Sequence, residues 1–401
     1  MSKGHFLYPR RTQHGHPHST RRLRSATTAC CLVGERLEER RLLALAPIDA
    51  SLLEIVREED VSHPGFWNVS FSRTDGTSAP MRLEFRMTND GLAFRTDTNS
   101  AFDPDLDRDM AGIQTISGIS RLTVIGGAGV DSVLLDETSA PLARAFQIDG
   151  ADGADRLEHR RNSDELFTSY LVEFNAQTGL AQLTRDGADA TRDTRALNHE
   201  AVEEFAFYGA NDGARSDLMV RTGSGEADRV VWQPGRFDLE LASLLPGPVQ
   251  QRVWYQGTPN TWLYTAGGGD SVTINDHGTA TSGPKQRLFV STEDEDDFLQ
   301  VNLSGTQSSV DLTLEGRGGF NRLEMYSIRN DAEEYSLTAH SLDHRRVAVN
   351  EQNFCRFSEI RQIHLSAGNG DDLISAPVLC VHSALPVCAS TAWKTPARSP
   401  M

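Results

Sequence analysis

One phrase recurs along most of this chain and limits the folds that the chain can adopt. It consists of a short strand of alternating apolar residues, a Gly-rich turn, an acidic or amide residue, and a second short strand. The clearest copy runs from Leu122 to Leu135, and the next runs from Phe146 to Leu157. Alternation with a period of two is typical of β-strands, and Gly permits tight turns between them. The residues that close the turns, here called the anchor residues, are Asp131, Asp155, Asp270, Asp297, Asn321 and Asp372.

The spacing of the anchor residues indicates a repeat. Three of the gaps between successive anchors are 24, 27 and 24 residues, and the gap from Asn321 to Asp372 is 51, about twice as long. Weaker copies centre on Asp217 and Asp228. A period near 25 falls in the range of solenoid coils and stacked hairpins. Each unit would expose strand edges that only a neighbour covers, so we expect the units to stack.

These features predict an all-β fold. We expect residues 112–374 to form an elongated β-solenoid or stack of hairpins, with the Gly-Asp turns along one edge. Residues 46–111 are expected to form a small β-rich region, because Asn89-Asp-Gly91 lies between two apolar runs, a strong hairpin signal. The pattern is lost after Ile374, so residues 375–401 are expected to form an irregular tail. Further strand candidates are Leu166–Phe174, Val230–Trp232 and Tyr335–Leu337, and the best helix candidates are the short segments Ala201–Phe205 and Leu239–Leu245.

The first 45 residues differ from the rest in charge. They contain nine Lys or Arg and three Asp or Glu, a net charge of +6, and since the whole chain carries −17, the remainder carries −23. A body this acidic repels phosphate backbones, so we expect no binding to nucleic acid. We expect residues 1–45 to be a disordered basic leader, although the apolar stretch is milder than that of an ordinary secretory signal. The sequence has no run of 18 apolar residues, so we expect no transmembrane span. The positions of the five cysteines do not suggest a disulfide framework.

A short motif follows these basic residues at positions 35–44, Glu-Arg-Leu-Glu-Glu-Arg-Arg-Leu-Leu-Ala. It resembles the N-terminal motif of planctomycete extracellular proteins, in which a Leu-Glu-x-Arg-x-Leu-Leu core follows a long basic leader. The resemblance covers about ten residues of the chain. It implies export to the cell surface or the medium, and it implies no activity. The matching positions are Leu37, Glu38, Arg40, Leu42, Leu43 and Ala44.

The turns also suggest a candidate chemistry. The segment from Gly126 to Leu134, Gly-Gly-Ala-Gly-Val-Asp-Ser-Val-Leu, fits the nonapeptide of calcium-binding β-rolls, and the body thus resembles a degenerate form of these RTX (hemolysin-type) repeats. In such turns Gly permits the left-handed backbone, carbonyls point inward, and Asp completes an oxygen shell for calcium. The resemblance implies candidate calcium turns at Asp131, Asp155, Asp270, Asp297 and Asp372.

An alternative explains the same turns without a cation. β-roll repeats follow one another every nine residues, whereas these copies stand about 25 residues apart, so adjacent half-sites are not assured. Asp is also common in turns because its side chain accepts hydrogen bonds from backbone N–H groups. Stacked carboxylates repel one another unless a cation or a donor lies between them. The sequence leaves both interpretations open.

The sequence favours a protein without catalytic activity. Acidic residues recur at every turn, so no carboxylate pair stands out, and the chain has no nucleophile-elbow, zincin or P-loop motif. We expect an exported structural or adhesion protein of a cell surface or extracellular matrix, whose partners are surface proteins or glycans.

Two alternatives belong to other classes of function. One is a secreted module that binds glycans or proteins, in which Trp67, Trp232, Trp254 and Trp262 are candidates for a sugar platform as well as for core positions. The other is a β-helix polysaccharide lyase or hydrolase, with the acidic pair Asp296–Asp297 near aromatic residues.

Overall fold

The computed structural model of this chain describes residues 52–74, 79–96, 101–103, 118–140, 142–143, 145–160, 167–175, 180–187, 195–200, 202–208, 215–223, 225, 227–241, 249–256, 258–276, 286–303, 310–327, 333–338, 340–346, 351–367 and 373–375. All of these residues belong to one compact unit, which spans Leu45–Met401. The predicted leader and most of the predicted tail lie outside the described residues.

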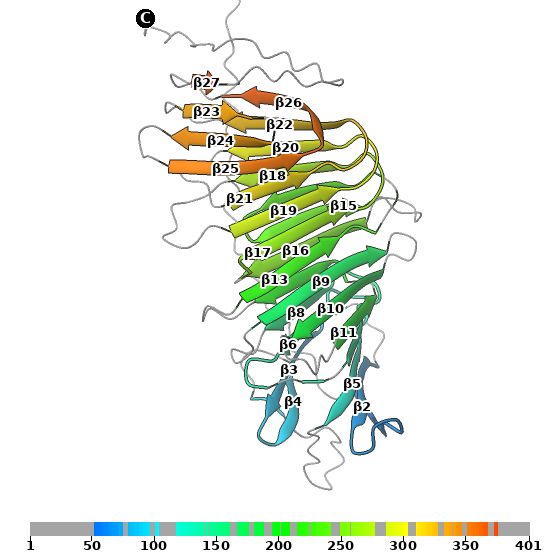
Figure 1. Cartoon of the computed structure of the whole chain (residues 1–401). Coiled ribbons are helices and arrows are strands. Elements are labelled where there is room, and N and C mark those ends of the chain that lie inside the picture. Colours follow the sequence, from blue (N-terminus) through cyan, green and yellow to red (C-terminus); the bar gives the residue numbers. More distant parts are fainter. Residues whose placement is uncertain are drawn as a thin grey trace, which may run out of the picture. The chain divides into compact units, whose positions relative to one another are not determined.

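The described residues form 27 strands, arranged in two large sheets, and contain no helix (Figure 1). In order across the 15-stranded sheet A, the strands are β1 (Leu53–Glu59), β2 (Trp67–Arg73), β5 (Ile119–Ile125), β7 (Ala145–Asp149), β11 (Arg195–Glu200), β10 (Leu180–Gly187), β9 (Phe167–Asn175), β13 (Arg215–Arg221), β17 (Asn260–Thr265), β19 (Gln286–Thr292), β21 (Val310–Glu315), β25 (Glu351–Ser358), β24 (Ser341–Arg346), β23 (Glu333–Leu337) and β27 (Leu373–Ser375). In order across the 12-stranded sheet B, they are β26 (Ile360–Ser366), β22 (Asn321–Ser327), β20 (Phe298–Leu303), β18 (Ser271–Asp276), β14 (Arg229–Gln233), β15 (Arg236–Leu241), β16 (Val249–Gln256), β12 (Glu204–Tyr208), β8 (Arg156–Arg160), β6 (Ser132–Asp136), β3 (Arg82–Thr88) and β4 (Gly91–Arg95).

The chain alternates between the two sheets. After β5 in sheet A it forms β6 in sheet B, then β7 parallel to β5, then β8 parallel to β6. The same alternation runs from β17 to β22, with parallel pairs in both sheets. The prediction of an all-β fold is therefore confirmed for the described residues, as two large and mostly parallel sheets. Within the same residues, no helix is long and apolar enough to cross a membrane.

Three antiparallel meanders replace single strands in this alternation: β9–β11 and β23–β25 in sheet A, and β14–β16 in sheet B. In the first, the chain enters at β9, folds back twice, and returns as β11 parallel to β7, while β9 itself pairs in parallel with the later strand β13. Each meander adds two strands between neighbouring turns. This accounts for the irregular length of the repeat, because the interval from Asn321 to Asp372 contains the meander β23–β25.

The region before the repeat shares the same sheets. The predicted hairpin is confirmed, since β3 and β4 pair antiparallel around a turn in which Gly91 has a φ of 109°. However, β2 pairs with β5 and β3 pairs with β6, both in parallel, so these strands continue the sheets of the repeat.

Both helix candidates were wrong. Glu204 and Phe205 belong to β12, and Leu239–Leu241 belongs to β15, while residues 242–245 lie outside the described part. The physical reason is clear in the second segment, where Phe237, Leu239 and Leu241 alternate with polar residues and are buried in one core.

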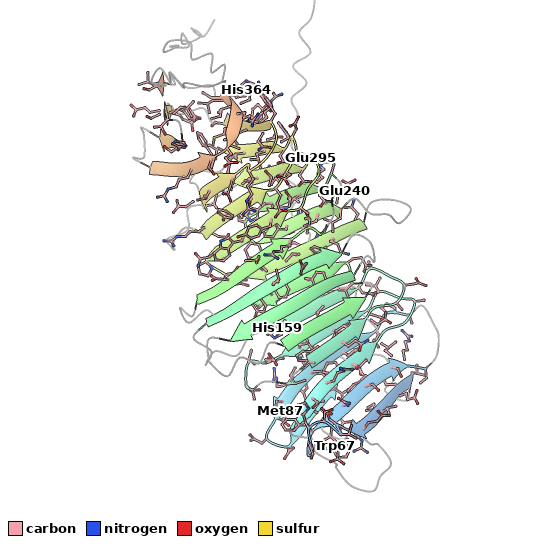
Figure 2. All side chains as sticks on the ribbon, turned by 45° about the vertical axis from the view of Figure 1, so that its right-hand side comes forward. Trp67, Met87, His159, Glu240, Glu295 and His364 are labelled. Atoms are coloured by element: carbon pink, nitrogen blue, oxygen red, sulfur yellow. The ribbon has the colours of Figure 1, made fainter. Side chains whose placement is uncertain are left out.

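The core lies between the sheets and is rich in aromatic rings. Phe71 of sheet A packs edge-to-face on Phe85 of sheet B, with the ring centres 4.8 Å apart. Tyr170 of sheet A stacks on Phe207 of sheet B, with the ring centres 4.9 Å apart. A buried polar network also bridges the sheets. His159 (labelled in Figure 2) lies 3.0 Å from the carboxylate of Glu137 and 3.1 Å from the hydroxyl of Tyr170.

Four of the turns that precede strands of sheet B have a left-handed residue two positions before the anchor. Gly153, Gly268 and Gly319 have φ values of 148°, 116° and 75° there. The equivalent residue between β19 and β20 is Glu295, with a φ of 88° (Figure 2). A side chain is strained in this conformation, whereas Gly adopts it freely.

We predict that Glu295→Gly raises the free energy of unfolding by about 1 kcal/mol, because relief of the left-handed strain exceeds the added backbone entropy of Gly. Urea denaturation measures the change. A matched control is Asp294→Gly, which removes one exposed carboxylate from the same turn and should destabilise the protein, since Asp294 has no positive φ. Conversely, Gly319→Ala should destabilise it, because a Cβ there would overlap the carbonyl oxygen of Glu295. A loss of stability in Glu295→Gly would contradict the argument.

Candidate functional site: a row of carboxylates at the turns

Four of the five candidate calcium residues occupy one equivalent position. Asp131, Asp155, Asp270 and Asp297 each immediately precede a strand of sheet B, and each is at most 2% exposed. Asp372 lies outside the described residues, and the strand after it, β27, belongs to sheet A. The side chains that share this position are here called the turn row: Asp131, Asp155, Glu203, Asp228, Asp270, Asp297 and Asn321.

Hydrogen bonds link the members of the turn row in two runs. In the first run, Asp131 Oδ1 accepts the backbone N–H of Met81 at 2.8 Å. Asp155 Oδ1 then accepts the N–H of Asp131 at 2.6 Å, and Glu203 Oε2 accepts the N–H of Asp155 at 2.7 Å. Each side chain thus bonds the backbone of the turn before it, across 24 to 50 residues of sequence.

The second run has the same geometry. Asp270 Oδ1 accepts the N–H of Asp228 at 2.8 Å, and Asp297 Oδ1 accepts the N–H of Asp270 at 2.9 Å. Asn321 Oδ1 ends the run by accepting the N–H of Asp297 at 3.0 Å. The Asp side chains therefore satisfy backbone N–H groups, as the alternative without a cation predicts, and they do so between turns.

The second atom of each side chain has a different environment. In Asn321 this atom is the amide nitrogen, which donates to the carbonyls of Gly316 and Gly318 and, at 3.4 Å, to that of Glu359. In Asp155, Asp270 and Asp297 it is Oδ2, which is buried and has no partner at hydrogen-bond distance, although the hydroxyls of Thr265 and Thr292 lie near enough to lower the pKa of Asp270 and Asp297. A buried, ionised oxygen without a partner is unfavourable, so these turns favour a proton or a cation at Oδ2.

Burial shifts the titration of these carboxyls. Loss of water raises the pKa of Asp155 to about 7, and the nearby charges of Asp131 and Glu203 act in the same direction. Burial likewise raises the pKa of Asp270 to about 7 and that of Asp297 to about 6. Burial also raises the pKa of Glu203. The turn row therefore holds several carboxyls that titrate close to neutral pH.

Asp131 differs from Asp155, Asp270 and Asp297. Its Oδ2 accepts the backbone N–H of Gly127 at 2.7 Å. A cavity of about 10 Å³, lined by Gly126, Asp131, Gly150 and Asp155, lies beside it and has room for one water-sized sphere. The described residues contain no group of three or more His, Cys, Asp or Glu side chains placed to hold a metal ion. Backbone carbonyls would therefore have to supply most ligands of a cation at this turn.

The sequence missed one member of the turn row, and one of its weak copies does not belong to the row. Glu203 lies in the row although its turn lacks the Gly-rich phrase, and Asp228, the centre of a weak copy, joins the row through its backbone N–H. Asp217, the other weak copy, lies inside β13 and accepts a hydrogen bond from the side chain of Asn260 at 2.8 Å. The meanders hide Glu203, because it lies 48 residues after Asp155.

Comparisons with known proteins add no relative to this description: no protein family model, no curated protein and no solved structure matches the chain.

We predict that the protein is more stable at pH 5 than at pH 8. Between about pH 4 and pH 7 the folded state holds protons on Asp155, Asp270 and Asp297 that the unfolded state has released. The free energy of unfolding then falls as pH rises, by up to roughly 1.4 kcal/mol per pH unit for each such group, and the loss is complete above the folded pKa values. Thermal melts across this range measure the slope.

The double variant Asp270→Asn, Asp297→Asn tests the cause. It keeps the Oδ1 acceptors and places amide nitrogens where Asn321 has one, so the stability should rise at pH 8 and the slope should shrink. Asp152→Asn removes one exposed carboxylate beside the same row and should leave the slope unchanged. Equal slopes in the double variant and in the wild type would rule out these carboxyls as the source.

Proposed function

We propose that this chain is an exported, non-catalytic structural or adhesion protein of a cell surface or extracellular matrix. We also propose that the alternating strands are coils of a β-solenoid, in which each passage through both sheets is one coil. The observation that carries the proposal is the turn row, because it adds side-chain hydrogen bonds between coils to the backbone bonds within the sheets. Stability in such a stack depends on contacts between neighbouring coils, and these bonds reinforce those contacts.

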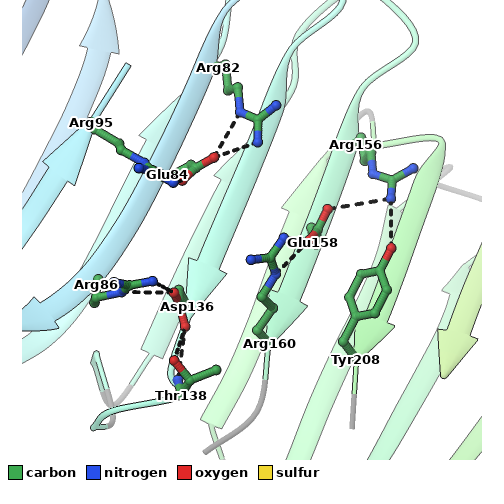
Figure 3. Close-up of polar contacts among 10 residues, drawn as sticks. All are labelled: Arg82, Glu84, Arg86, Arg95, Asp136, Thr138, Arg156, Glu158, Arg160 and Tyr208. Atoms are coloured by element: carbon green, nitrogen blue, oxygen red, sulfur yellow. Dashed lines mark hydrogen bonds and ion pairs between the residues drawn. The ribbon is translucent and has the colours of Figure 1, made fainter. Parts of the chain in front are cut away.

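The outer face of sheet B supports the same proposal. Ion pairs follow neighbouring strands here, within strands and between them (Figure 3). Glu84, 1% exposed, pairs with Arg82 and Arg95, so it links β3 to β4. Single exposed ion pairs contribute little, but a connected network with half-buried partners contributes more and keeps the face polar. The ion pairs form three groups, which are Arg82, Glu84 and Arg95, then Arg86 and Asp136, and then Arg156, Glu158, Arg160 and Glu204.

Calcium is a second way to neutralise the turn row, and we propose it on the strength of the buried Oδ2 atoms without partners. A cation would replace the proton at pH values where the carboxyls are ionised. The cavity beside Asp131 and Asp155 is where this proposal places the first ion. Backbone carbonyls of the Gly-rich turns would complete the shell.

We predict that millimolar calcium raises the melting temperature at pH 8. A ligand at a hundredfold excess over its Kd adds about 2.7 kcal/mol to the free energy of unfolding. The increase should shrink in Asp155→Asn, and magnesium should replace calcium poorly because it demands a more regular shell. If the melting temperature is the same in calcium and in chelator, the turn row does not bind calcium and its carboxyls only bind protons and accept hydrogen bonds.

The export proposal rests on the resemblance of residues 35–44 to the planctomycete motif. We predict that the double variant Leu42→Asp, Leu43→Asp of the full chain accumulates in the cytoplasm of a planctomycete host, whereas the wild type reaches the surface or the medium. Val61→Asp, at a position that is 93% exposed, is the matched control and should be exported normally. Fractionation with an antibody against the body measures both. Wild-type protein that stays in the cytoplasm with its leader intact would overturn the proposed function.

A further inference from the structure

Sheet A carries one continuous row of side chains on its outer face. The row, here called the outer row, crosses seven strands, from β9 to β24, and each residue pairs in register with the next. On β9, β13, β17 and β19 the neighbours within each strand, such as Val220 and Leu263, are buried, so this part of the row points away from the core. In order it contains Leu171, Met219, Trp262, Phe289, Thr313, Arg356 and Ser341.

One half of the outer row is apolar. Leu171, Met219, Trp262 and Phe289 follow one another on β9, β13, β17 and β19, and all are half-buried. The ring of Tyr264 lies 5.8 Å from that of Phe289 and widens this half. Four half-buried apolar side chains on the solvent side of neighbouring strands form a continuous, partly exposed apolar strip, and contiguous apolar surface is a common property of binding sites. Trp232, in contrast, is fully buried in the core.

The other half is polar and opens into a groove. Thr313, Arg356 and Ser341 continue the row and line a groove of about 420 Å³, together with His340 and Ser358. Arg356 and His340 are exposed. The groove is shallow and largely open to solvent. Hydroxyl groups, a guanidinium and an imidazole therefore gather at the end of the apolar half.

Hydrogen-bonding side chains border the apolar half on both sides. On the same strands, Asp217 and Asn260 lie on one side, and Arg221 lies on the other, with its guanidinium 5.6 Å from the centre of the Tyr264 ring. The apolar strip is thus one residue wide between polar borders, except at Tyr264, where it is two residues wide.

From this arrangement we propose that the outer row binds a single chain of an acidic polysaccharide, with sugar rings on Trp262 and Phe289 and a uronate carboxylate at Arg356. A sugar ring has an apolar face that stacks on aromatic rings and hydroxyl edges that bond polar borders. Arg binds a carboxylate through two parallel N–H donors. The inference rests on the proposed adhesion function and specifies its partner.

The width of the strip distinguishes a polysaccharide from a folded protein partner. A stable protein interface buries about 1,200 Å² or more around a broad apolar core. A strip one residue wide, bordered by polar side chains, matches a single extended chain better. Acidic side chains beside the groove weaken its attraction for an anion. Asp311 and Glu315 flank Thr313 on β21, and Glu315 lies 3.5 Å from Arg317. Ring stacking must therefore contribute, and a plain polyanion should bind weakly.

The test measures binding of the full chain by isothermal titration calorimetry to three probes. These are polygalacturonate, a neutral cello-oligosaccharide and poly-glutamate. We expect saturable binding to polygalacturonate, and binding at least about tenfold weaker to the other two, because each lacks one of the two recognised groups. Equal affinity for poly-glutamate would mean that charge alone drives binding. Equal affinity for the neutral oligosaccharide would mean that Arg356 does not bind a carboxylate of the ligand. No binding to polygalacturonate would overturn the proposal.

Variants locate the site. Trp262→Ala should weaken binding by about tenfold or more, since aromatic anchors dominate such contacts. Its matched control is Trp254→Ala, which removes a half-buried Trp from the outer face of sheet B and should leave binding unchanged. Arg356→Gln should weaken binding, whereas Arg229→Gln, at an exposed position of sheet B, should not. Where Trp262→Ala fails to fold, Thr313→Asp places a negative charge in the groove and should abolish binding.

The two levels of the proposal fail separately. Polygalacturonate binding by a protein that stays in the cytoplasm would leave the outer row in place and overturn the adhesion function. If the protein is exported but Trp262→Ala and Trp254→Ala bind polygalacturonate with the same affinity, the adhesion function stands and the outer row is not the binding site.

Discussion

The hydrogen bond from a backbone N–H of one turn to the side-chain oxygen of the next is the interaction on which the stack depends. Parallel strands bond their neighbours along their length, but the turns between the sheets leave polar backbone groups that need other partners. The turn row meets this need at Asp131 and Asp270 in the same way, although they are 139 residues apart. A residue therefore needs a side chain that accepts a hydrogen bond because of its position along the stack, whatever its distance in sequence from the donor.

That acceptor has a chemical cost, because a carboxylate brings one more oxygen than the bond requires. Asn321 avoids the difficulty, since its amide nitrogen donates to the carbonyls that surround it. The Asp residues instead place a titratable group in a nearly dry position, and their raised pKa values follow from it. Asp at positions where Asn would bond more completely makes the turn row sensitive to the binding of protons.

Sequence alone predicted the strands and most of the turn row, for physical reasons that also explain its failures. Alternation identifies a strand because one face is buried, so Phe146 and Ile148 are recognisable without knowledge of their partners. Pairing partners lie far apart in sequence, and alternation looks the same in a parallel coil and in an antiparallel meander, so β9–β11 could not be predicted. Glu295 was equally hidden, because nothing in its type indicates a left-handed backbone. The outer row depended on register, which the sequence does not specify between strands 27 or 43 residues apart.

The meander β14–β16 interrupts the turn row, and this has a mechanical consequence. Gln251 occupies the position beside Glu203, yet its Oε1 is buried without a hydrogen-bond partner. The backbone N–H of Glu203 donates instead to the carbonyl of Asp155. Among the described residues no turn bond connects the two runs in this region, where the sheets, the core and ion pairs such as that between Arg252 and Glu204 join them. Under tension along the stacking direction, such a molecule would part first at this joint, and each side would remain folded as a block with its own run of turns.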